Sequence, residues 1–314
     1  MSFKISKAAS IVVVAFFSAL LPALVSAVDD GPRMYWNGPV GLNIMQTYAW
    51  TIHGNAVTPS GALFDKDATV DMNLVLMGYN RIFDFFGQSA IFTTMVTAGN
   101  ATATFPTTPL SNITQSSRGY GDVYFQGTFN IIGGPALSAE EFADYEQKTL
   151  LYLLLGLSTP TGEYDQDRIL NMGMNRWGVR VGLPFIQTLG NWEPGNITTL
   201  EILPSAWYYG DNDEFVGNSK LEQDVLYTLE AHLTHDVTPT FYVSLDYLYQ
   251  SGGETTLNGV KSGDAQSADF LGATFGYQLN EQLQFLFRYN ATLNPDTEKE
   301  LSLDIIQLNL NYFW

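Results

Sequence analysis

Several charged side chains lie in segments whose other residues alternate between apolar and polar types. In NRWGVRVGLPF, residues 175–185, Arg176 and Arg180 lie on the face opposite Trp177 and Val179, as the two-residue period of a β-strand requires. The same alternation places further charged residues on polar faces: Arg288, Asp122, Glu201, Asp224, Glu230 and Asp246. Guanidinium and carboxylate groups can pair with one another, and a ring of such charges can select solutes by charge.

These charges support two interpretations. An unpaired charge is costly in a low-dielectric environment, so the acidic and basic side chains could neutralise one another and fix the shape of the protein. Alternatively, Arg176, Arg180 and Arg288 face acidic residues across a constriction and filter solutes. Both interpretations require strands that bring residues distant in the sequence around one enclosed space.

The sequence offers little support for a catalytic or metal-binding site. It has no cysteine and three histidines, and it contains no G-x-S-x-G motif that would present a nucleophilic serine. The acidic loops 163–167 and 211–214 provide carboxylates but lack the spacing of a calcium-binding loop. We therefore expect no catalytic residue, no metal site and no cofactor.

Twelve segments carry the alternating pattern that would position these charges. They lie near residues 39–51, 67–81, 88–98, 119–132, 148–158, 175–187, 197–209, 222–234, 239–250, 267–278, 282–293 and 301–314. The connections after odd-numbered segments are mostly long and polar, and most of the others are short. Strands of about ten residues with alternately long and short connections are typical of a transmembrane β-barrel, with both termini on the periplasmic side.

The start and the composition of the chain fit an exported membrane protein. Lys4 and Lys7 precede an apolar run that is interrupted by Pro22 and ends in small residues at Ala27. This order predicts a secretory signal peptide over residues 1–27, with a membrane-anchoring helix as the alternative. No later stretch holds the run of about 18 apolar residues that a spanning helix needs. The net charge of −18 argues against a nucleic-acid partner.

We therefore predict an all-β fold, in which residues 28–314 form a 12-stranded antiparallel transmembrane β-barrel. A water-soluble β-sandwich would carry many Lys and Glu residues on its outer face, whereas these polar faces carry mainly Asn, Gln, Ser and Thr. Ser138 and Glu141 form a capping-box pattern, which predicts a short periplasmic helix. Aromatic residues near strand ends, including Trp36 and Trp50, are expected in the girdles where lipid meets water.

The chain ends inside a strand pattern. The apolar residues of one face are Ile306, Leu308, Leu310, Tyr312 and Trp314. This last strand must pair with the first, because lipid tolerates no open sheet edge. Leu303 and Ile305 are out of phase with that face, which predicts a β-bulge near residues 305–306.

The predicted barrel encloses a narrow bore. Twelve strands lie between the eight of a filled barrel and the sixteen of an open porin. Only residues 28–38 precede the first predicted strand, and these are too few for a plug domain. A gate would therefore have to come from a folded-in loop, for which the Thr-, Pro- and Ser-rich loop 99–118 is the longest candidate.

Three stretches resemble one family of proteins. RGYGDVYFQGTFNI (118–131), LSAEEFADYEQKTLLYLLLGLSTPTGEYD (137–165) and NRWGVRVGLPF (175–185) are similar to the outer-membrane transporters grouped under the meta-pathway of phenol degradation. The resemblance implies a bacterial outer-membrane channel for the passive uptake of small, aromatic or hydrophobic solutes, with no catalytic residues. A structural or surface-interaction barrel without transport is the alternative.

The final strand also resembles the C-terminal signal of bacterial outer-membrane barrels. This resemblance implies that Tyr312 and Trp314 are recognised by the barrel-assembly machinery. The expected partners are thus this machinery, outer-membrane lipid and lipopolysaccharide around the wall, and a small-molecule solute in the bore.

Overall fold

The structure, a computed structural model, describes residues 29–54, 69–108, 111–168, 170–263, 265–293 and 302–314. These residues are mostly β-strand, with a short helix α2 (Ala139–Phe142). No helix in this part of the chain has the length and apolar character needed to cross a membrane. The predicted signal peptide lies outside the described residues.

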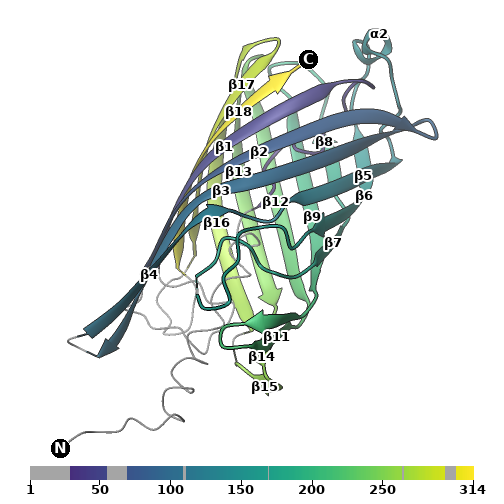
Figure 1. Cartoon of the computed structure of the whole chain (residues 1–314). Coiled ribbons are helices and arrows are strands. Elements are labelled where there is room, and N and C mark those ends of the chain that lie inside the picture. The colour runs from purple at the N-terminus through teal and green to yellow at the C-terminus, as the bar shows by residue number, and fades with distance from the viewer. Residues whose placement is uncertain (1–28, 55–68, 109–110, 169, 264, 294–301) are drawn as a thin grey trace, which may run out of the picture.

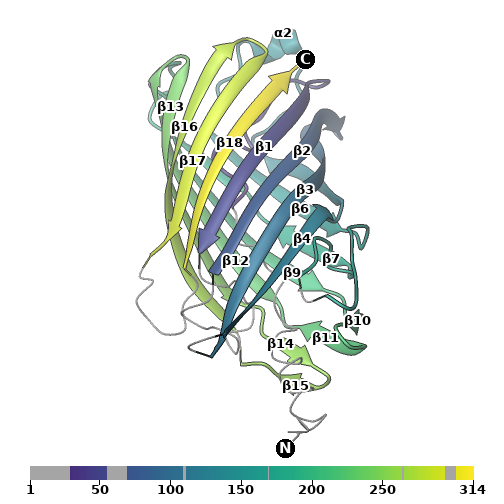
Figure 2. The same cartoon turned by 60° about the vertical axis from the view of Figure 1, so that its left-hand side comes forward.

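Twelve antiparallel strands form a closed barrel (Figure 1). In order around the wall they are β1 (Asn43–Gly54), β2 (Thr69–Phe85), β3 (Gln88–Thr108), β5 (Tyr124–Ile132), β6 (Thr149–Ser158), the two-part strand β7 (Gly178–Gly182) and β8 (Phe185–Leu189), β9 (Thr198–Tyr209), β12 (Leu226–Thr238), β13 (Phe241–Gly252), β16 (Gln266–Asn280), β17 (Leu283–Thr292) and β18 (Leu303–Phe313). Figure 2 shows β18 beside β1, where the barrel closes. The prediction of an all-β, 12-stranded barrel is confirmed.

The outer face of the wall is apolar. On β18 the outward-facing Ile306 and Leu308 are 44% and 43% exposed, whereas the inward-facing Gln307 and Asn309 are buried. Hydrocarbon can surround such a surface, because a closed barrel pairs its backbone groups within the wall. The wall is that of a membrane-spanning β-barrel.

The β-bulge predicted near residues 305–306 is wrong. The registers of β18 with β17 and with β1 run through these residues without a shift. Leu303 and Ile305 belong to the inner face, where each is 1% exposed within a cluster of apolar side chains. The change of phase in the sequence therefore reflects a change along the inner face, from apolar side chains at one end to Gln307 and Asn309 at the other.

Pro184 divides one wall strand into β7 and β8. Proline has no N–H for the hydrogen-bond ladder and so interrupts a strand. The wall stays closed at this point, because Leu183 N donates to Pro204 O at 3.1 Å and Tyr152 N donates to Pro184 O at 2.9 Å. Neighbouring β6 and β9 each pair with both parts.

Two further groups of strands lie at the end of the barrel opposite α2 (Figure 1). β4 (Ser111–Tyr120) pairs with β3, and the hydroxyls of Thr102 and Ser116 are 3.0 Å apart across this pair. β10 (Asn212–Phe215), β11 (Ser219–Gln223), β14 (Thr255–Leu257) and β15 (Val260–Lys261) form a small sheet. The prediction of a loop over residues 99–118 is wrong, because its threonines favour extended, paired strands.

The capping box at α2 is present as predicted. Ser138 N donates to Glu141 Oε2 at 2.9 Å, and Glu141 N donates to Ser138 Oγ at 3.3 Å. The Ser138 N–H and hydroxyl hold the pKa of the Glu141 carboxyl below its usual value. α2 and the C terminus lie at the same end of the barrel (Figure 1), which is the periplasmic end in barrels with this arrangement of connections.

Candidate functional site

The chain before β1 runs inside the barrel. Residues 29–42, here called the lumen segment, begin with Asp29, which is 5% exposed. Gly31 has a φ of 97°, and a Cβ at this position would lie 2.7 Å from Arg288 Nη1, so only glycine fits where the segment passes this arginine. Residues 28–38 were predicted to be too few for a plug domain, but ion pairs and hydrogen bonds with the wall hold this short segment inside the bore.

Two aspartates of the lumen segment pair with two arginines of the wall. Asp29 forms an ion pair with Arg288 of β17. Both carboxylate oxygens of Asp30 lie 2.9 Å from Nη1 of Arg180, on β7. Arg180 also donates to Glu230 of β12 at 2.8 Å. All of these groups are buried except Asp30, which is partly buried, so the loss of one partner would leave a buried charge uncompensated.

A third arginine belongs to the lumen segment itself. Arg33 Nη2 lies 2.7 Å from Asp236 at the end of β12. Glu201 of β9 accepts hydrogen bonds from Arg33 N and Trp36 Nε1, each at 2.8 Å. The Arg33 guanidinium also lies 4.2 Å from the Trp36 ring centroid and 4.0 Å from that of Tyr242, distances typical of cation–π contacts. Trp36 therefore points into the lumen and does not belong to the predicted lipid girdle.

The paired charges continue along the wall from β12 to β13. Nδ1 of His232 lies 2.7 Å from Asp246 and 3.9 Å from Asp29. Asp246 also accepts a hydrogen bond from Ser244 at 2.6 Å. We call the whole set the charge girdle; its members are Asp29, Asp30, Arg33, Arg180, Glu201, Glu230, His232, Asp236, Asp246 and Arg288.

Five of the predicted lumen residues meet in the charge girdle: Arg180, Arg288, Glu201, Glu230 and Asp246. Arg176 is buried apart from it, where it donates to Gln223 and lies 4.6 Å from the Tyr209 ring centroid. Asp224 does not face the lumen as predicted; its side chain is 62% exposed and lies 3.2 Å from Lys261. Asp224 precedes β12 and its N–H donates to Glu254 O, so the alternation of the strand does not extend to it.

Asp122 holds a loop that folds into the barrel from the end opposite α2. Its carboxylate oxygens accept hydrogen bonds from Gly162 N at 2.7 Å and Met174 N at 2.8 Å. Gly162 and Gly173 pass so closely that a Cβ on Gly162 would lie 2.6 Å from Gly173 Cα. This loop between β6 and β7 also buries Leu170 among the apolar residues of the lumen.

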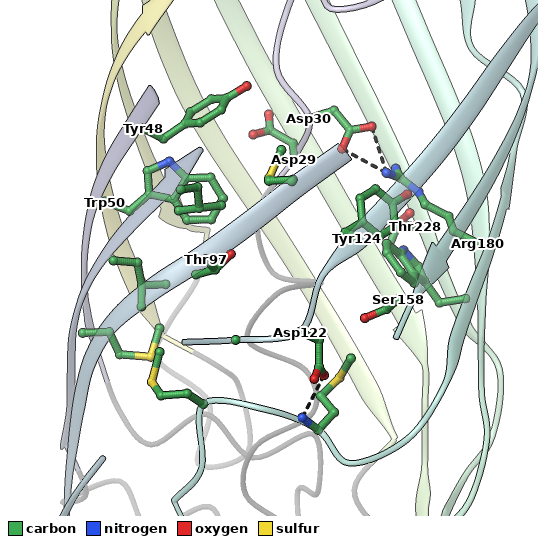
Figure 3. A pocket seen from close by; sticks show the side chains of 18 of the residues that line it. Asp29, Asp30, Tyr48, Trp50, Thr97, Asp122, Tyr124, Ser158, Arg180 and Thr228 are labelled. Carbon is green, nitrogen blue, oxygen red and sulfur yellow. Dashed lines mark hydrogen bonds and ion pairs between the residues drawn. The ribbon is translucent and has the colours of Figure 1, made fainter. Parts of the chain in front are cut away.

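An apolar chamber of about 160 Å³ lies between this loop and the charge girdle (Figure 3). The side chains that line it include Tyr48, Trp50, Met72, Leu74, Met95 and Met172. Trp50, predicted for the lipid girdle, thus faces the lumen. Small apolar solutes favour such a concave, largely apolar space with a few polar groups.

A second chamber of about 210 Å³ lies on the α2 side of the charge girdle. Its lining is mixed: amide and hydroxyl side chains such as those of Gln46, Asn80, Thr93 and Asn309 lie beside apolar ones such as Ile82 and Leu286. Asn80 donates to Gln46 at 2.7 Å and accepts from Thr93 at 2.6 Å. The lumen segment and the charge girdle therefore separate the apolar chamber from one of mixed lining, here called the polar chamber for its amide side chains.

The sequence of β2 carries a signal for the apolar chamber. On β2, Val75 and Met77 are exposed on the outside, while Leu74 and Leu76 are buried on the inside. A wall strand that is apolar on both faces indicates an apolar lumen at that level. The lumen segment has no such periodic signal.

The aromatic residues at the end of the chain lie on the outside of the barrel, where β18 meets β1. Tyr312 and Trp314 are 44% and 49% exposed, with ring centroids 5.6 Å apart. Trp314 O accepts a hydrogen bond from Asn43 N at 2.9 Å. Their recognition by the assembly machinery stays a prediction.

Known proteins share this architecture. An outer membrane channel from Pseudomonas putida F1 matches with a TM-score of 0.76 and 19% identity, over 91% of this chain and 100% of that one. The transport unit of the autotransporter AIDA-I from Escherichia coli matches with a TM-score of 0.51 and 8% identity, over 99% of both chains. At these identities the matches show the fold alone.

No curated protein matches the chain. A family model described as "Putative MetA-pathway of phenol degradation" matches residues 49–308. Because this match spans most of the chain, the protein belongs to that family.

Proposed function

We propose that the protein is a channel of the bacterial outer membrane through which small apolar solutes, aromatic ones included, pass down their concentration gradient. The observation that carries this proposal is the apolar chamber inside a membrane-spanning wall. A pore for ions or sugars needs a polar lining along its length, whereas Trp50, Leu74 and Met172 surround this part of the lumen.

In this proposal the lumen segment is the barrier between the two chambers. Arg180 and Arg288 hold it through Asp30 and Asp29, so these arginines position the barrier more than they filter solutes. Arg176, which lies outside the charge girdle, remains a candidate for acting on charged solutes near the loops.

The remaining predictions fit the same proposal. Signal cleavage after Ala27 would leave one residue, Val28, before the lumen segment in the mature chain. Tyr312 and Trp314 would guide assembly of the barrel, and lipid and lipopolysaccharide would surround its apolar exterior. The protein needs no cofactor for passive transport.

A second candidate function is a structural or surface-interaction barrel. The charge girdle favours it, because ion pairs that close the lumen also brace the wall, and the small sheet of β10, β11, β14 and β15 lies at the outer end. In this case the loops and the sheet would carry the function and no solute would cross.

Uptake by intact cells separates the two candidates. We expect a deletion strain that is complemented with the wild-type gene to take up a labelled single-ring hydrocarbon faster than the strain with an empty vector. The control is a deletion strain that expresses an unrelated outer-membrane barrel at the same level. Equal uptake in all three strains, with folded protein present in the outer membrane, would contradict the channel.

A further inference from the structure

Two methionines lie where the apolar chamber meets the polar chamber. Met34 of the lumen segment and Met95 of β3 each line both chambers, and each residue is partly exposed. Figure 3 shows methionine sulfur atoms, in yellow, around the apolar chamber. The two thioether side chains therefore face open space at the boundary between the chambers.

The other residues that line both chambers are Asp30, Tyr124 and Arg288. Asp30 and Arg288 belong to the ion pairs of the charge girdle. Tyr124 donates a hydrogen bond to Gln126 at 2.9 Å. Because polar contacts hold these three side chains in place, a change in the opening between the chambers has to come from the methionines.

The wall beside Met95 carries a glycine on its inner face. Gly78 of β2 lies opposite Met95 on one side and opposite Gln46 of β1 on the other. A Cβ on Gly78 would lie 3.7 Å from Met95 Cε and 3.4 Å from Gln46 Oε1, so both side chains extend over the glycine. Nε2 of Gln46 also donates to the sulfur of Met34 at 3.7 Å, which brings the lumen segment to the same place.

The backbone does not require a glycine at this position. Gly78 lies in the extended strand β2, and a Cβ there would make only ordinary contacts. A glycine inside a strand weakens it and often marks a point where a ligand approaches closely. Gly78 therefore provides room on the inner face of the wall, next to Met95.

The lumen segment is held toward the opposite side of the barrel. Asp30 pairs with Arg180 of β7, and Asp30 N donates to Glu230 of β12 at 2.8 Å. Arg33 pairs with Asp236, also on β12. In the order of strands around the wall, β12 lies across the bore from β2. These contacts leave the side of β2 and β3 for a passage.

We propose that solutes move between the chambers through an opening between Met34 and Met95, beside Gly78, and that the two thioether side chains select planar apolar solutes. The inference rests on the proposed function and deepens it, because it places the path beside the lumen segment and away from its ion pairs. We call this opening the methionine passage.

The chemistry of methionine suits this role. Its side chain is unbranched and has three rotatable bonds, so it can move aside for a ring, and its sulfur makes favourable contacts with aromatic rings. Charged solutes are disfavoured, because thioethers cannot replace their hydration.

Cysteine labelling tests the methionine passage, because the chain contains no cysteine of its own. The variants are Met34→Cys and Met95→Cys, and the control is Met77→Cys, at an exposed position on the outside of the wall. Each is expressed in the deletion strain and treated with benzyl methanethiosulfonate, which attaches a single ring to the cysteine through a disulfide. Uptake of labelled ethylbenzene, a single-ring hydrocarbon, is measured before and after treatment, and mass spectrometry of the purified protein gives the extent of labelling.

We expect labelling of Met34→Cys and of Met95→Cys to lower ethylbenzene uptake to the level of the empty-vector strain, because the attached ring fills the passage. Met77→Cys should take up ethylbenzene equally fast before and after labelling. A second variant, Gly78→Leu, needs no reagent: leucine occupies the room beside Met95, so uptake should fall although folded barrel is present in the outer membrane. Its control is Val75→Leu, on the outer face of β2.

Full labelling of Met34→Cys and Met95→Cys with unchanged uptake would overturn the methionine passage while the channel proposal stands. The passage is also wrong if both variants stay unlabelled while Met77→Cys reacts, because a single ring then cannot reach the two positions.

The apolar chamber is tested separately by calorimetry of ethylbenzene binding, with the wild-type mature protein in lipid nanodiscs and empty nanodiscs as the reference. If the wild type neither binds ethylbenzene nor raises its uptake above that of the empty-vector strain, the proposed function fails together with the inference.

Discussion

The two chambers differ although the same strands build both. Along the inner face of β2, only apolar side chains such as Met72 and Leu74 face the apolar chamber, whereas Asn80 and Ile82 face the polar chamber. On β18 the corresponding change runs from Ile305 to Asn309. The boundary between the two chambers coincides with the charge girdle. The inner-face side chains of the wall therefore change in polarity at the level where the wall holds the lumen segment.

This difference indicates how a narrow barrel can keep an apolar space inside. Buried charges that pair with one another exclude water at the boundary without leaving an uncompensated ion. The apolar side chains beyond the boundary can then pack against the infolded loop. The comparison therefore predicts that changes at the boundary have larger effects than changes within either chamber.

The largest effect is expected from Arg180→Ala. This change leaves Asp30 and Glu230 without their shared cation, and removal of one partner from a buried ion pair costs about 3–5 kcal/mol. We expect a matching loss in the free energy of unfolding, measured by urea denaturation in lipid vesicles. A variant with wild-type stability would show that the girdle does not brace the barrel.

A smaller effect, on solute binding, is expected from placing a polar side chain in the apolar chamber. Leu74→Asn places an amide in the apolar chamber and should weaken ethylbenzene binding about tenfold, through lost apolar contact and a poorly paired polar group. The matched control, Asn80→Leu on the same face of β2, changes the polar chamber and should leave this binding unchanged. Equal effects of both variants would remove the functional distinction between the chambers.

A local effect is expected from Asp122→Asn. The variant replaces a carboxylate that accepts from Gly162 N and Met174 N and should weaken the attachment of the infolded loop by about 1 kcal/mol. Hydrogen exchange at the amides of Gly162 and Met174 should become faster, while exchange in β6 stays as in the wild type. Unchanged exchange at both amides would show that Asp122 does not hold the loop.

The smallest effect is expected outside the lumen. Asp224 and Lys261 form an exposed ion pair, and exposed pairs contribute little to stability. Asp224→Asn should leave unfolding, conductance and solute binding unchanged. A clear change in conductance would place Asp224 in the pathway, as the strand alternation had predicted.

Much of the wall was predictable, because lipid on one side and a lumen on the other impose a two-residue period. The positions of Arg180, Glu230 and Asp246 on the inner face follow from this period. The position of Leu303 and Ile305 on the inner face could not be predicted in this way. When apolar residues occupy the inner face, the sequence looks the same as that of a strand interrupted by a β-bulge. The lumen segment was missed for a different reason: its place depends on long-range ion pairs such as Asp30 with Arg180, which leave no local pattern.

The central claim is that Asp29 and Asp30 hold the lumen segment across the bore. Single-channel conductance in planar bilayers, recorded for the wild type, the double variant Asp29→Asn/Asp30→Asn and the control Asp224→Asn, tests it most directly. We expect a conductance several times higher in the double variant alone, because the segment loses both of its carboxylates and no longer blocks the bore. Equal conductance in all three would contradict the account.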